Sequence, residues 1–319
     1  MNSKKILVTG AAGFIGFHLL KEISKNHNFE ITVIDNFSRG KKDIEFNNLL
    51  KEKRNIKVKK IDLTGSFKIN ENYTHIFHLA AIVGVQNVRK NPIKTFNTNL
   101  ISTLNILKAF ENKNKKPLII FFSTSEVYQP LLDKKKLKFP TSEKQKFTYP
   151  TLFNSRQSYY LSKFFSEIIL QLANFRYIIY RPHNIYGPRM GYSHVIPELF
   201  LKFSKDRIKV DVFSPYHKRA FCYIDDAIKL IVGSCFKKKS LNKVFNIGNM
   251  KEEVKIVDLA KKIKKFLNSK KNIYLRENTL GSPFRRIPDT KKIQKIVKIK
   301  KFVSLNEGLK KTILWYQKK

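Results

Sequence analysis

Near its start the chain carries a short apolar strand that runs into a glycine-spaced turn and then into a helix. The stretch reads Lys5-Ile-Leu-Val-Thr-Gly10-Ala-Ala-Gly13-Phe-Ile-Gly16. The three glycines allow, in order, a sharp turn after the strand, close approach of the backbone to a phosphate, and close packing of the helix on the sheet. Because the helix N-terminus then faces an anion, the pattern predicts a site for the pyrophosphate of a dinucleotide.

A second apolar strand, residues 30–35, ends at Asp35, 19 residues after Gly16. A carboxylate at this position accepts hydrogen bonds from the ribose hydroxyls of a dinucleotide. It favours NAD as the cofactor, because the 2′-phosphate of NADP would meet a like charge. Arg39 lies close enough along the chain to keep NADP open as an alternative.

Apolar runs that suit buried parallel strands recur along the chain, with helical patterns between most of them. The expected strands are residues 6–8, 31–34, 56–61, 75–79, 118–122 and 177–180, and the best helices are residues 15–25, 93–110 and 158–173. This alternation predicts an α/β fold with a doubly wound parallel (Rossmann) sheet. We expect an NAD-binding Rossmann domain of residues 1–182 plus 219–249. A smaller interleaved α/β substrate-binding domain then takes residues 183–218 plus 250–319.

The chain is strongly basic, with 64 Lys and Arg against 24 Asp and Glu among 319 residues. Such a charge attracts polyanions at low salt. The lysines are scattered, without interleaved aromatic residues, so we expect solvated surfaces and no specific nucleic acid partner; a non-catalytic nucleotide- or polyanion-binding protein is the remote alternative. The lysine-rich stretch from Leu131 to Thr148 is expected to form a mobile surface loop.

The two cysteines, Cys222 and Cys235, lie in apolar surroundings and lack the spacing of metal ligands. They are expected to be reduced core residues of a cytoplasmic protein that holds no metal. No apolar run reaches the length of a membrane span, so no membrane insertion is expected.

Tyr159 and Lys163 are four residues apart at the start of an expected helix, so their side chains lie on one face. A neighbouring ammonium lowers the pKa of a phenol, which lets a tyrosine act as a base near neutral pH. Tyr160 has Phe164 at the corresponding position, so Tyr159 is the candidate base. A functionless pair on a helix surface is the alternative.

Hydroxyls and a carboxylate follow the expected strand 118–122, at the rim where α/β sheets bind ligands. They are Ser123, Thr124, Ser125 and Glu126. Thr124 is expected to hydrogen-bond the substrate oxygen that Tyr159 deprotonates, while NAD accepts hydride from the adjoining carbon. Ser125 is a substrate-binding candidate, although a structural role is favoured for both Ser123 and Ser125.

Further motifs follow in order along nearly the whole chain: Asp35-Asn-Phe-Ser, Asp62-Leu63, His78-Leu-Ala-Ala81, Asn99, Ser123-Thr-Ser-Glu-Val-Tyr128 and Arg181-Pro-His-Asn-Ile-Tyr-Gly-Pro188. Together with the glycine turn and the Tyr159–Lys163 pair, they resemble the NAD-dependent epimerase/dehydratase family. These are extended short-chain dehydrogenases/reductases that act on nucleotide sugars.

The resemblance implies further contacts with each ligand. At the NAD pyrophosphate it implies Phe14 and Ile15, and at the adenosine half Asn36 beside Asp35, with Asp62 and Leu63 at the adenine. Ala80 and Ala81 are expected along the cofactor. Asn99 is expected on the cofactor side of its helix, and Lys163 at the nicotinamide ribose. The implied contacts with the nucleotide-diphosphate sugar are Asn184 and the arginines Arg219, Arg285 and Arg286, because a guanidinium binds phosphate in a bidentate manner. An ion pair of the arginine pair with Asp289 is the alternative.

In this family the first step is oxidation at sugar C4, and the resemblance leaves the following step open. A UDP-sugar 4-epimerase needs no further acid or base, and it is the leading expectation. A nucleotide-sugar 4,6-dehydratase or a UDP-glucuronate decarboxylase needs another group near C5, for which Glu126 is placed; a simple reductase is a further alternative. The family's usual pairing predicts a homodimer through the helices at 93–110 and 158–173.

Overall fold

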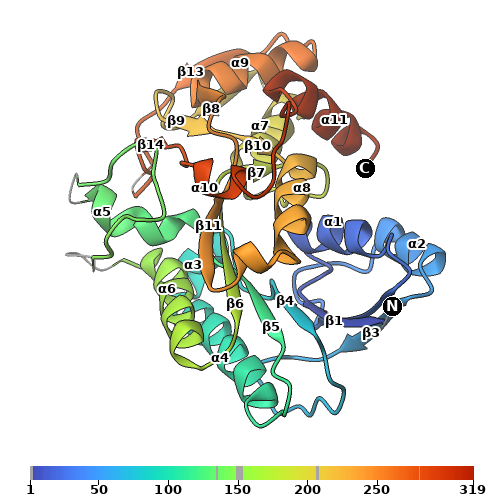
Figure 1. The fold of residues 1–319 in the computed structure, drawn as a ribbon. Helices are drawn as coiled ribbons and strands as arrows, with labels where there is room; N and C mark the ends of the chain where they lie inside the picture. The colour runs from blue at the N-terminus through green and yellow to red at the C-terminus, as the bar shows by residue number, and fades with distance from the viewer. Residues whose placement is uncertain (1–2, 134–135, 149–153, 206–207, 280) are drawn as a thin grey trace. The chain divides into compact units, whose positions relative to one another are not determined.

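The computed structural model describes residues 3–133, 136–148, 154–205, 208–279 and 281–319 (Figure 1). The chain forms two compact units. The first comprises Met1–Val127, Leu152–Arg181 and Ile228–Phe245, and the second comprises Tyr128–Thr151, Pro182–Ala227 and Asn246–Lys319.

The first unit is built on a seven-stranded parallel sheet with the order β11-β6-β5-β4-β1-β2-β3. The strands are β1 (Lys4–Thr9), β2 (Phe29–Asp35), β3 (Ile56–Lys60), β4 (His75–His78), β5 (Leu118–Phe122), β6 (Tyr177–Pro182) and β11 (Lys243–Ile247). The doubly wound parallel sheet predicted from the sequence is therefore confirmed. The strand order reverses between β1 and β4, and ligands of such sheets bind beyond the carboxyl ends of the strands at that point.

Helices accompany the sheet strands in the alternation that the sequence predicts. They are α1 (Phe14–Ile23), α2 (Ile44–Glu52), α3 (Val85–Lys90), α4 (Pro92–Phe110), α6 (Gln157–Leu172) and α8 (Ile224–Cys235). Pro92 begins α4, where its fixed φ suits the first helical turn and its missing N–H removes no hydrogen bond. Helices α4 and α6 lie side by side (Figure 1).

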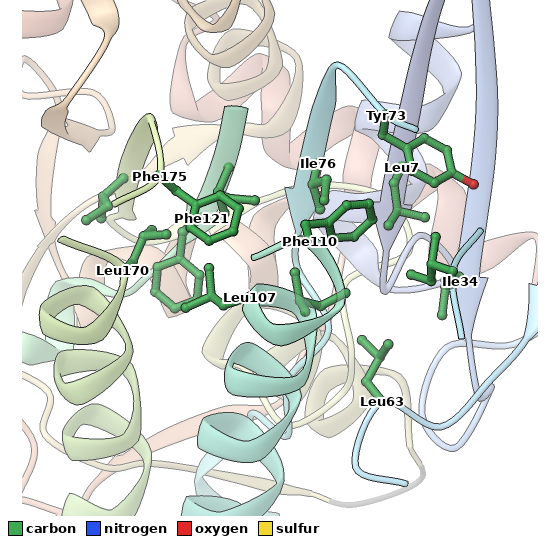
Figure 2. Packing of buried hydrophobic residues seen from close by; sticks show 14 residues of the cluster. Leu7, Ile34, Leu63, Tyr73, Ile76, Leu107, Phe110, Phe121, Leu170 and Phe175 are labelled. Carbon is green, nitrogen blue, oxygen red and sulfur yellow. The ribbon is translucent and has the colours of Figure 1, made fainter. Parts of the chain in front are cut away.

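The main apolar core of the first unit lies where α4 and α6 cover the sheet. Figure 2 shows Leu107 and Phe110 of α4 and Leu170 of α6 packed near the strand residues Ile76 and Phe121. All five are at most 5% exposed. Burying a large apolar side chain stabilises a fold by about 1.5–3 kcal/mol, so this layer fixes the helix that carries Tyr159 and Lys163 against the sheet.

The second unit combines helices with three small sheets. Its helices are α5 (Gln129–Asp133), α7 (Val195–Ser204), α9 (Ile256–Phe266), α10 (Lys291–Gln294) and α11 (Leu305–Gln317). The sheets have the orders β12-β9-β14, β10-β7 and β13-β8. Their strands are β7 (Ile185–Tyr186), β8 (Lys209–Val212), β9 (Lys218–Ala220), β10 (Cys222–Tyr223), β12 (Glu253–Lys255), β13 (Asn272–Leu275) and β14 (Arg285–Arg286).

Helix α11 shows why local sequence fixes an element of the second unit. Ser304 caps its N-terminus by accepting a hydrogen bond from the backbone N–H of Glu307, 3.3 Å away. A serine followed three residues later by glutamate is a common start signal of helices. Gly308 on this helix lies against Tyr186, where an added Cβ would be only 2.1 Å from the phenol oxygen.

The stretch from Leu131 to Thr148, which was expected to form a mobile surface loop, is described except for residues 134–135. Most of residues 136–148 lie outside helices and strands. Helix α5 takes the first residues of the stretch, and Thr141 is buried and forms a bridge with Pro288. The backbone N–H of Thr141 donates to Ile287 at 2.9 Å, and that of Asp289 donates to Thr141 at 2.7 Å. The high lysine content of this stretch therefore does not indicate that Thr141 is hydrogen-bonded to residues 287 and 289 of the second unit.

The two cysteines are buried and free, as the sequence predicted. Among the described residues, no helix has the length and apolar character that crossing a membrane requires.

Candidate active site

The glycine turn lies at the carboxyl end of β1, where the strand order reverses. Gly10 has a φ of +72°, and an added Cβ would lie 2.7 Å from the backbone nitrogen of Ala80. At Gly16 a Cβ would lie 2.3 Å from the carbonyl oxygen of Gly10. Larger side chains therefore cannot replace either glycine without moving the turn or the helix that follows it.

The start of α1 fits a bound pyrophosphate. Phe14 and Ile15 begin the helix, and Gly13 precedes it without any side-chain cap or acidic residue in the first turn. In the described part of the chain, Ser123 adds a buried hydroxyl that has no hydrogen-bond partner. It follows β5, which is separated from β1 by β4. Free helix N–H groups and an unmatched hydroxyl are the donors that a dinucleotide needs at this edge.

Asp35 links the end of β2 to the glycine turn. Its carboxylate accepts hydrogen bonds from the backbone N–H groups of Ala12 at 2.9 Å and Phe37 at 2.8 Å. Burial raises the pKa of Asp35, and these two hydrogen bonds oppose that shift. The carboxylate is thus fixed beside the turn, at the end of β2 where the sequence predicts a ribose contact.

Asn36 and Asp62 come together next to this carboxylate. The amide of Asn36 donates to Asp62 at 3.0 Å, and the backbone N–H of Thr64 donates to the same side chain at 2.9 Å. The hydrogen bonds from Thr64, and then that from Asn36, lower the pKa of Asp62, so it stays ionised. Leu63 is buried beside them.

The side chain of Asn99 forms hydrogen bonds with other residues of the first unit. Its side-chain oxygen accepts from the backbone N–H of Ile82 at 2.7 Å, and its amide donates to Ile82 O and to Ser162 Oγ, both at 3.1 Å. It thereby holds the loop after β4, which carries Ala80 and Ala81, to helix α6. The hydrogen bonds of Asn99 thus fix the position of this loop relative to α4 and α6.

The candidate catalytic residues of the first unit come from β5 and α6. Thr124 is buried just after β5, and its hydroxyl accepts from the backbone N–H of Glu126 at 3.2 Å. Tyr159 is half-buried, and Lys163 is buried one turn along α6. The ammonium of Lys163 lies 4.8 Å from the centre of the Phe121 ring.

Buried charges surround Lys163. Burial lowers the pKa of Lys163 to about 7, and the carboxylate of Glu167 one turn further opposes that shift. Glu167 is in turn paired with Arg181 on β6, whose Nε donates to it at 3.0 Å. Burial, followed by the charge of Lys163, lowers the pKa of His78 to about 3, so this imidazole stays neutral.

Arg156 is a candidate site residue that the sequence analysis missed. Its guanidinium lies 3.4 Å from a carboxylate oxygen of Glu126, and both side chains are partly buried, at 15% and 17% exposed. The sequence feature that could have identified Arg156 is its position three residues before Tyr159, immediately before helix α6. The pair puts a cation and a carboxylate beside Thr124.

The four substrate-binding candidates of the second unit lie together on β9, β14 and the loop after β6. Arg219 and Arg286 are register partners in neighbouring strands, and the amide of Asn184 donates to Ala220 O at 3.0 Å and Arg286 O at 3.4 Å. Arg219 also donates to Ser282 at 3.0 Å. This clustering is what binding of a diphosphate by several guanidinium groups requires.

Arg285 has a carboxylate partner other than the predicted Asp289. Its Nε and Nη2 donate to Glu253 at 2.8 and 2.9 Å, and this hydrogen bonding raises the pKa of Arg285. A cavity of about 500 Å³ lies nearby within the second unit, lined by Gln129, Leu132, Leu137, Phe139, Gly281, Ser282, Pro283 and Phe284. Ser282 belongs both to this cavity and to the contact with Arg219.

No group of three or more His, Cys, Asp or Glu side chains within the described ranges could hold a metal ion.

Comparison with known proteins identifies the family of the chain. Residues 6–248 match the model of the NAD dependent epimerase/dehydratase family. The chain is 30% identical to the UDP-N-acetyl-alpha-D-glucosaminuronate decarboxylase of Bacillus cytotoxicus, over 98% of both chains. It is also 30% identical to UDP-glucuronic acid decarboxylase 1 of Xenopus tropicalis, over 99% of this chain and 72% of that protein.

Among solved structures, the fold is similar to that of UDP-glucose 4-epimerase from Thermotoga maritima in complex with UDP-glucose. The TM-score is 0.82 at 26% sequence identity, and the match covers 98% of this chain and 99% of the other.

Proposed function

Since the chain belongs to the NAD-dependent epimerase/dehydratase family, we propose that it decarboxylates a UDP-linked uronic acid after oxidation at sugar C4. The protein is an NAD-dependent enzyme of nucleotide-sugar metabolism, and the proposal concerns which reaction follows the oxidation. The observation that carries it is the Glu126–Arg156 pair, 3.4 Å apart beside Thr124.

The proposed chemistry needs a proton acceptor at the C4 hydroxyl. Tyr159 takes that proton while Thr124 hydrogen-bonds the same oxygen, and Lys163 stabilises the ionised phenol. NAD, when bound, supplies the hydride acceptor. The product is a 4-keto uronate, in which the carboxyl carbon and the keto carbon flank C5.

A β-keto acid of this kind loses CO₂ readily, because the electron pair of the broken C5–C6 bond passes into an enolate between C4 and C5. Arg156 supplies a cation for the sugar carboxylate or the developing enolate. Glu126, which takes up a proton from solvent, then delivers that proton to C5. Tyr159 returns its proton to the C4 oxygen as C4 is reduced again, and a pentose product results.

The relatives add support of a different kind. The two curated proteins reported above are named as decarboxylases of UDP-linked uronic acids, and each is matched over nearly the whole of this chain. The sequence Thr124-Ser-Glu-Val-Tyr128 lies in the shared region and contains the proposed acid. For the substrate we propose that Asn184, Arg219 and Arg286 of the second unit contact the nucleotide diphosphate, while Arg285 is held by Glu253. We propose further that Ser125 contacts the sugar and that the first unit holds NAD.

A UDP-sugar 4-epimerase is the second candidate. Its support is the structural match to the UDP-glucose 4-epimerase of Thermotoga maritima over almost the whole chain. This reaction uses Tyr159, Thr124 and Lys163 in the same way and gives Glu126 no chemical part.

The two candidates are separated by incubating the protein, without added NAD, with UDP-glucuronate, UDP-N-acetylglucosaminuronate and UDP-glucose, and following the products by NMR. We expect UDP-glucuronate to give a UDP-pentose, or UDP-N-acetylglucosaminuronate to give the corresponding UDP-linked N-acetylamino pentose, each with release of CO₂. A product with inverted C4 and an intact C6 supports the epimerase instead, and absence of turnover with every UDP-, GDP- and dTDP-sugar contradicts both.

We further propose a homodimer formed through the outer faces of α4 and α6. Apolar side chains lie exposed on both helices, with Ile93 at 76% and Leu104 at 40% on α4, and Phe165 at 42% and Leu172 at 78% on α6. The rings of Phe96 and Phe165, 6.1 Å apart, connect the two helices. A second copy of the same face would bury this apolar strip.

The paired substitution Leu104→Glu with Phe165→Glu is expected to convert the dimer into a monomer of about 37.5 kDa, as measured by light scattering after gel filtration. Buried like charges at a two-fold interface repel each other and remain desolvated. Ile44→Glu is the matched control, because Ile44 is an apolar residue of α2 that is 72% exposed. A monomeric wild-type protein, or equal dissociation of the control, would contradict the proposed interface.

A further inference from the structure

The guanidinium of Arg219 on β9 is held in a fixed orientation by its neighbours. The side chain is buried, at 8% exposed. Its Nη1 donates to the carbonyl oxygen of Lys218 at 2.8 Å, and its Nη2 donates to Ser282 Oγ at 3.0 Å. Because the two hydrogen bonds leave from different nitrogens of one planar group, together they restrict its rotation.

Ser282 is shared between Arg219 and a histidine. His217 Nδ1 lies 3.1 Å from the same serine oxygen. A guanidinium can only donate, so Ser282 is the acceptor towards Arg219 and its hydroxyl hydrogen remains available for His217. Burial, followed by the charge of Arg219, lowers the pKa of His217, so the imidazole is neutral near pH 7 and has a nitrogen that can accept this hydrogen.

The imidazole of His217 is itself fixed in place. The backbone N–H of His217 donates to Ser214 O, and its carbonyl oxygen accepts from the backbone N–H of Ile256, both at 3.0 Å. Its ring meets that of Phe284 edge to face, with the ring centres 5.8 Å apart. The hydrogen-bonded chain that ends at the guanidinium therefore begins at a rigid group.

The segment that carries Ser282 also lies along the strand of Arg219. The backbone N–H of Lys218 donates to Phe284 O at 2.9 Å, and Arg286 of β14 is the register partner of Arg219 in β9. A hydroxyl and a neutral imidazole orient Arg219 without compensating its charge. Arg285 differs in this respect, because a carboxylate holds it.

We propose that Ser282 and His217 are positioning residues that hold the guanidinium of Arg219 for the diphosphate of the nucleotide. The inference rests on the proposed contact between Arg219 and that diphosphate. A guanidinium that is already oriented loses less conformational entropy when it binds phosphate, so the two residues raise the affinity for the nucleotide without touching it.

The test is isothermal titration of the purified protein with UDP, comparing wild type with Ser282→Ala, Arg219→Met and the double variant. Ser282→Ala is expected to weaken UDP binding by about 5- to 10-fold, and Arg219→Met by about 10- to 100-fold. In the double variant the serine has no guanidinium to hold, so its UDP affinity is expected to match that of Arg219→Met within about twofold. A serine that supports only the general fold would weaken binding by the same factor in both backgrounds, which overturns the proposal.

His217→Phe tests the other end of the hydrogen-bonded chain. It keeps an aromatic ring against Phe284 and removes the nitrogen that contacts Ser282, so it is expected to weaken UDP binding by about 2- to 10-fold. The melting temperature and the NAD content of each variant report whether it is folded. Wild-type affinity of either Ser282→Ala or His217→Phe for UDP overturns the proposal.

Ser269→Ala is the matched control, because Ser269 is a partly buried serine of the same unit whose hydroxyl accepts a backbone N–H, that of Lys271 at 3.4 Å. It is expected to bind UDP like wild type, and a loss equal to that of Ser282→Ala overturns the proposal. Wild-type affinity of Arg219→Met for UDP contradicts the proposed diphosphate contact, and the inference fails with it. A loss in Arg219→Met that Ser282→Ala does not share overturns the inference alone.

Discussion

Replacing Tyr159 with phenylalanine is expected to abolish turnover while leaving NAD bound. The substitution removes the phenolic oxygen that exchanges a proton with the C4 hydroxyl and keeps the ring that packs on α6. Loss of a general acid–base group lowers kcat by about 100- to 10,000-fold. The measurement is a rate assay with the accepted UDP-sugar, combined with quantification of NAD released when the purified protein is denatured.

Tyr160→Phe is the control for this prediction. Tyr160 is the next residue on the helix, is buried, and has Phe164 rather than a lysine one turn on. Its variant is expected to retain kcat within a few-fold of wild type. Comparable activity of Tyr159→Phe and wild type would show that another group is the base.

Replacing Glu126 with glutamine is expected to stop decarboxylation without stopping oxidation at C4. Glutamine has the shape of glutamate, and its side-chain oxygen can still accept from Arg156, so the local structure is conserved. It cannot deliver a proton to C5, and kcat for pentose formation is expected to fall by about 100- to 10,000-fold. NMR should then reveal an accumulating 4-keto sugar, with absorbance at 340 nm reporting reduced NAD.

Glu71→Gln is the matched control, since Glu71 is an exposed glutamate of the same unit that pairs with Lys59. It is expected to leave kcat unchanged. Wild-type decarboxylation by Glu126→Gln would remove Glu126 from the mechanism. If wild type and Glu126→Gln both invert C4, and at the same rate, the protein is a 4-epimerase.

The parts of the site that the sequence predicted are those that follow strand ends. Gly10 follows β1, Asp35 ends β2 and Thr124 follows β5. In a parallel sheet the carboxyl ends of all strands meet at one edge, so locating the strands is enough to group the residues that follow them. The apolar runs that define these strands are local and are readable without any knowledge of packing.

The features that the sequence did not predict depend on contacts between distant segments. Glu126 meets Arg156 across 30 residues, and Arg285 pairs with Glu253 across 32 residues instead of with its near neighbour Asp289. The path of the intervening loops decides such pairs, and no periodic pattern encodes it. The high lysine content of residues 131–148 likewise gave no indication that Thr141 is buried.

The buried ion pair between α6 and β6 has a consequence for how the base is activated. Lys163, Glu167 and Arg181 together sum to one positive charge while Lys163 holds its proton, and all three side chains are buried. Excess positive charge in a poorly polarisable interior favours any nearby group that can become an anion. We propose that this positive charge, carried by the residues that join helix to sheet, favours the phenolate of Tyr159 before substrate binds.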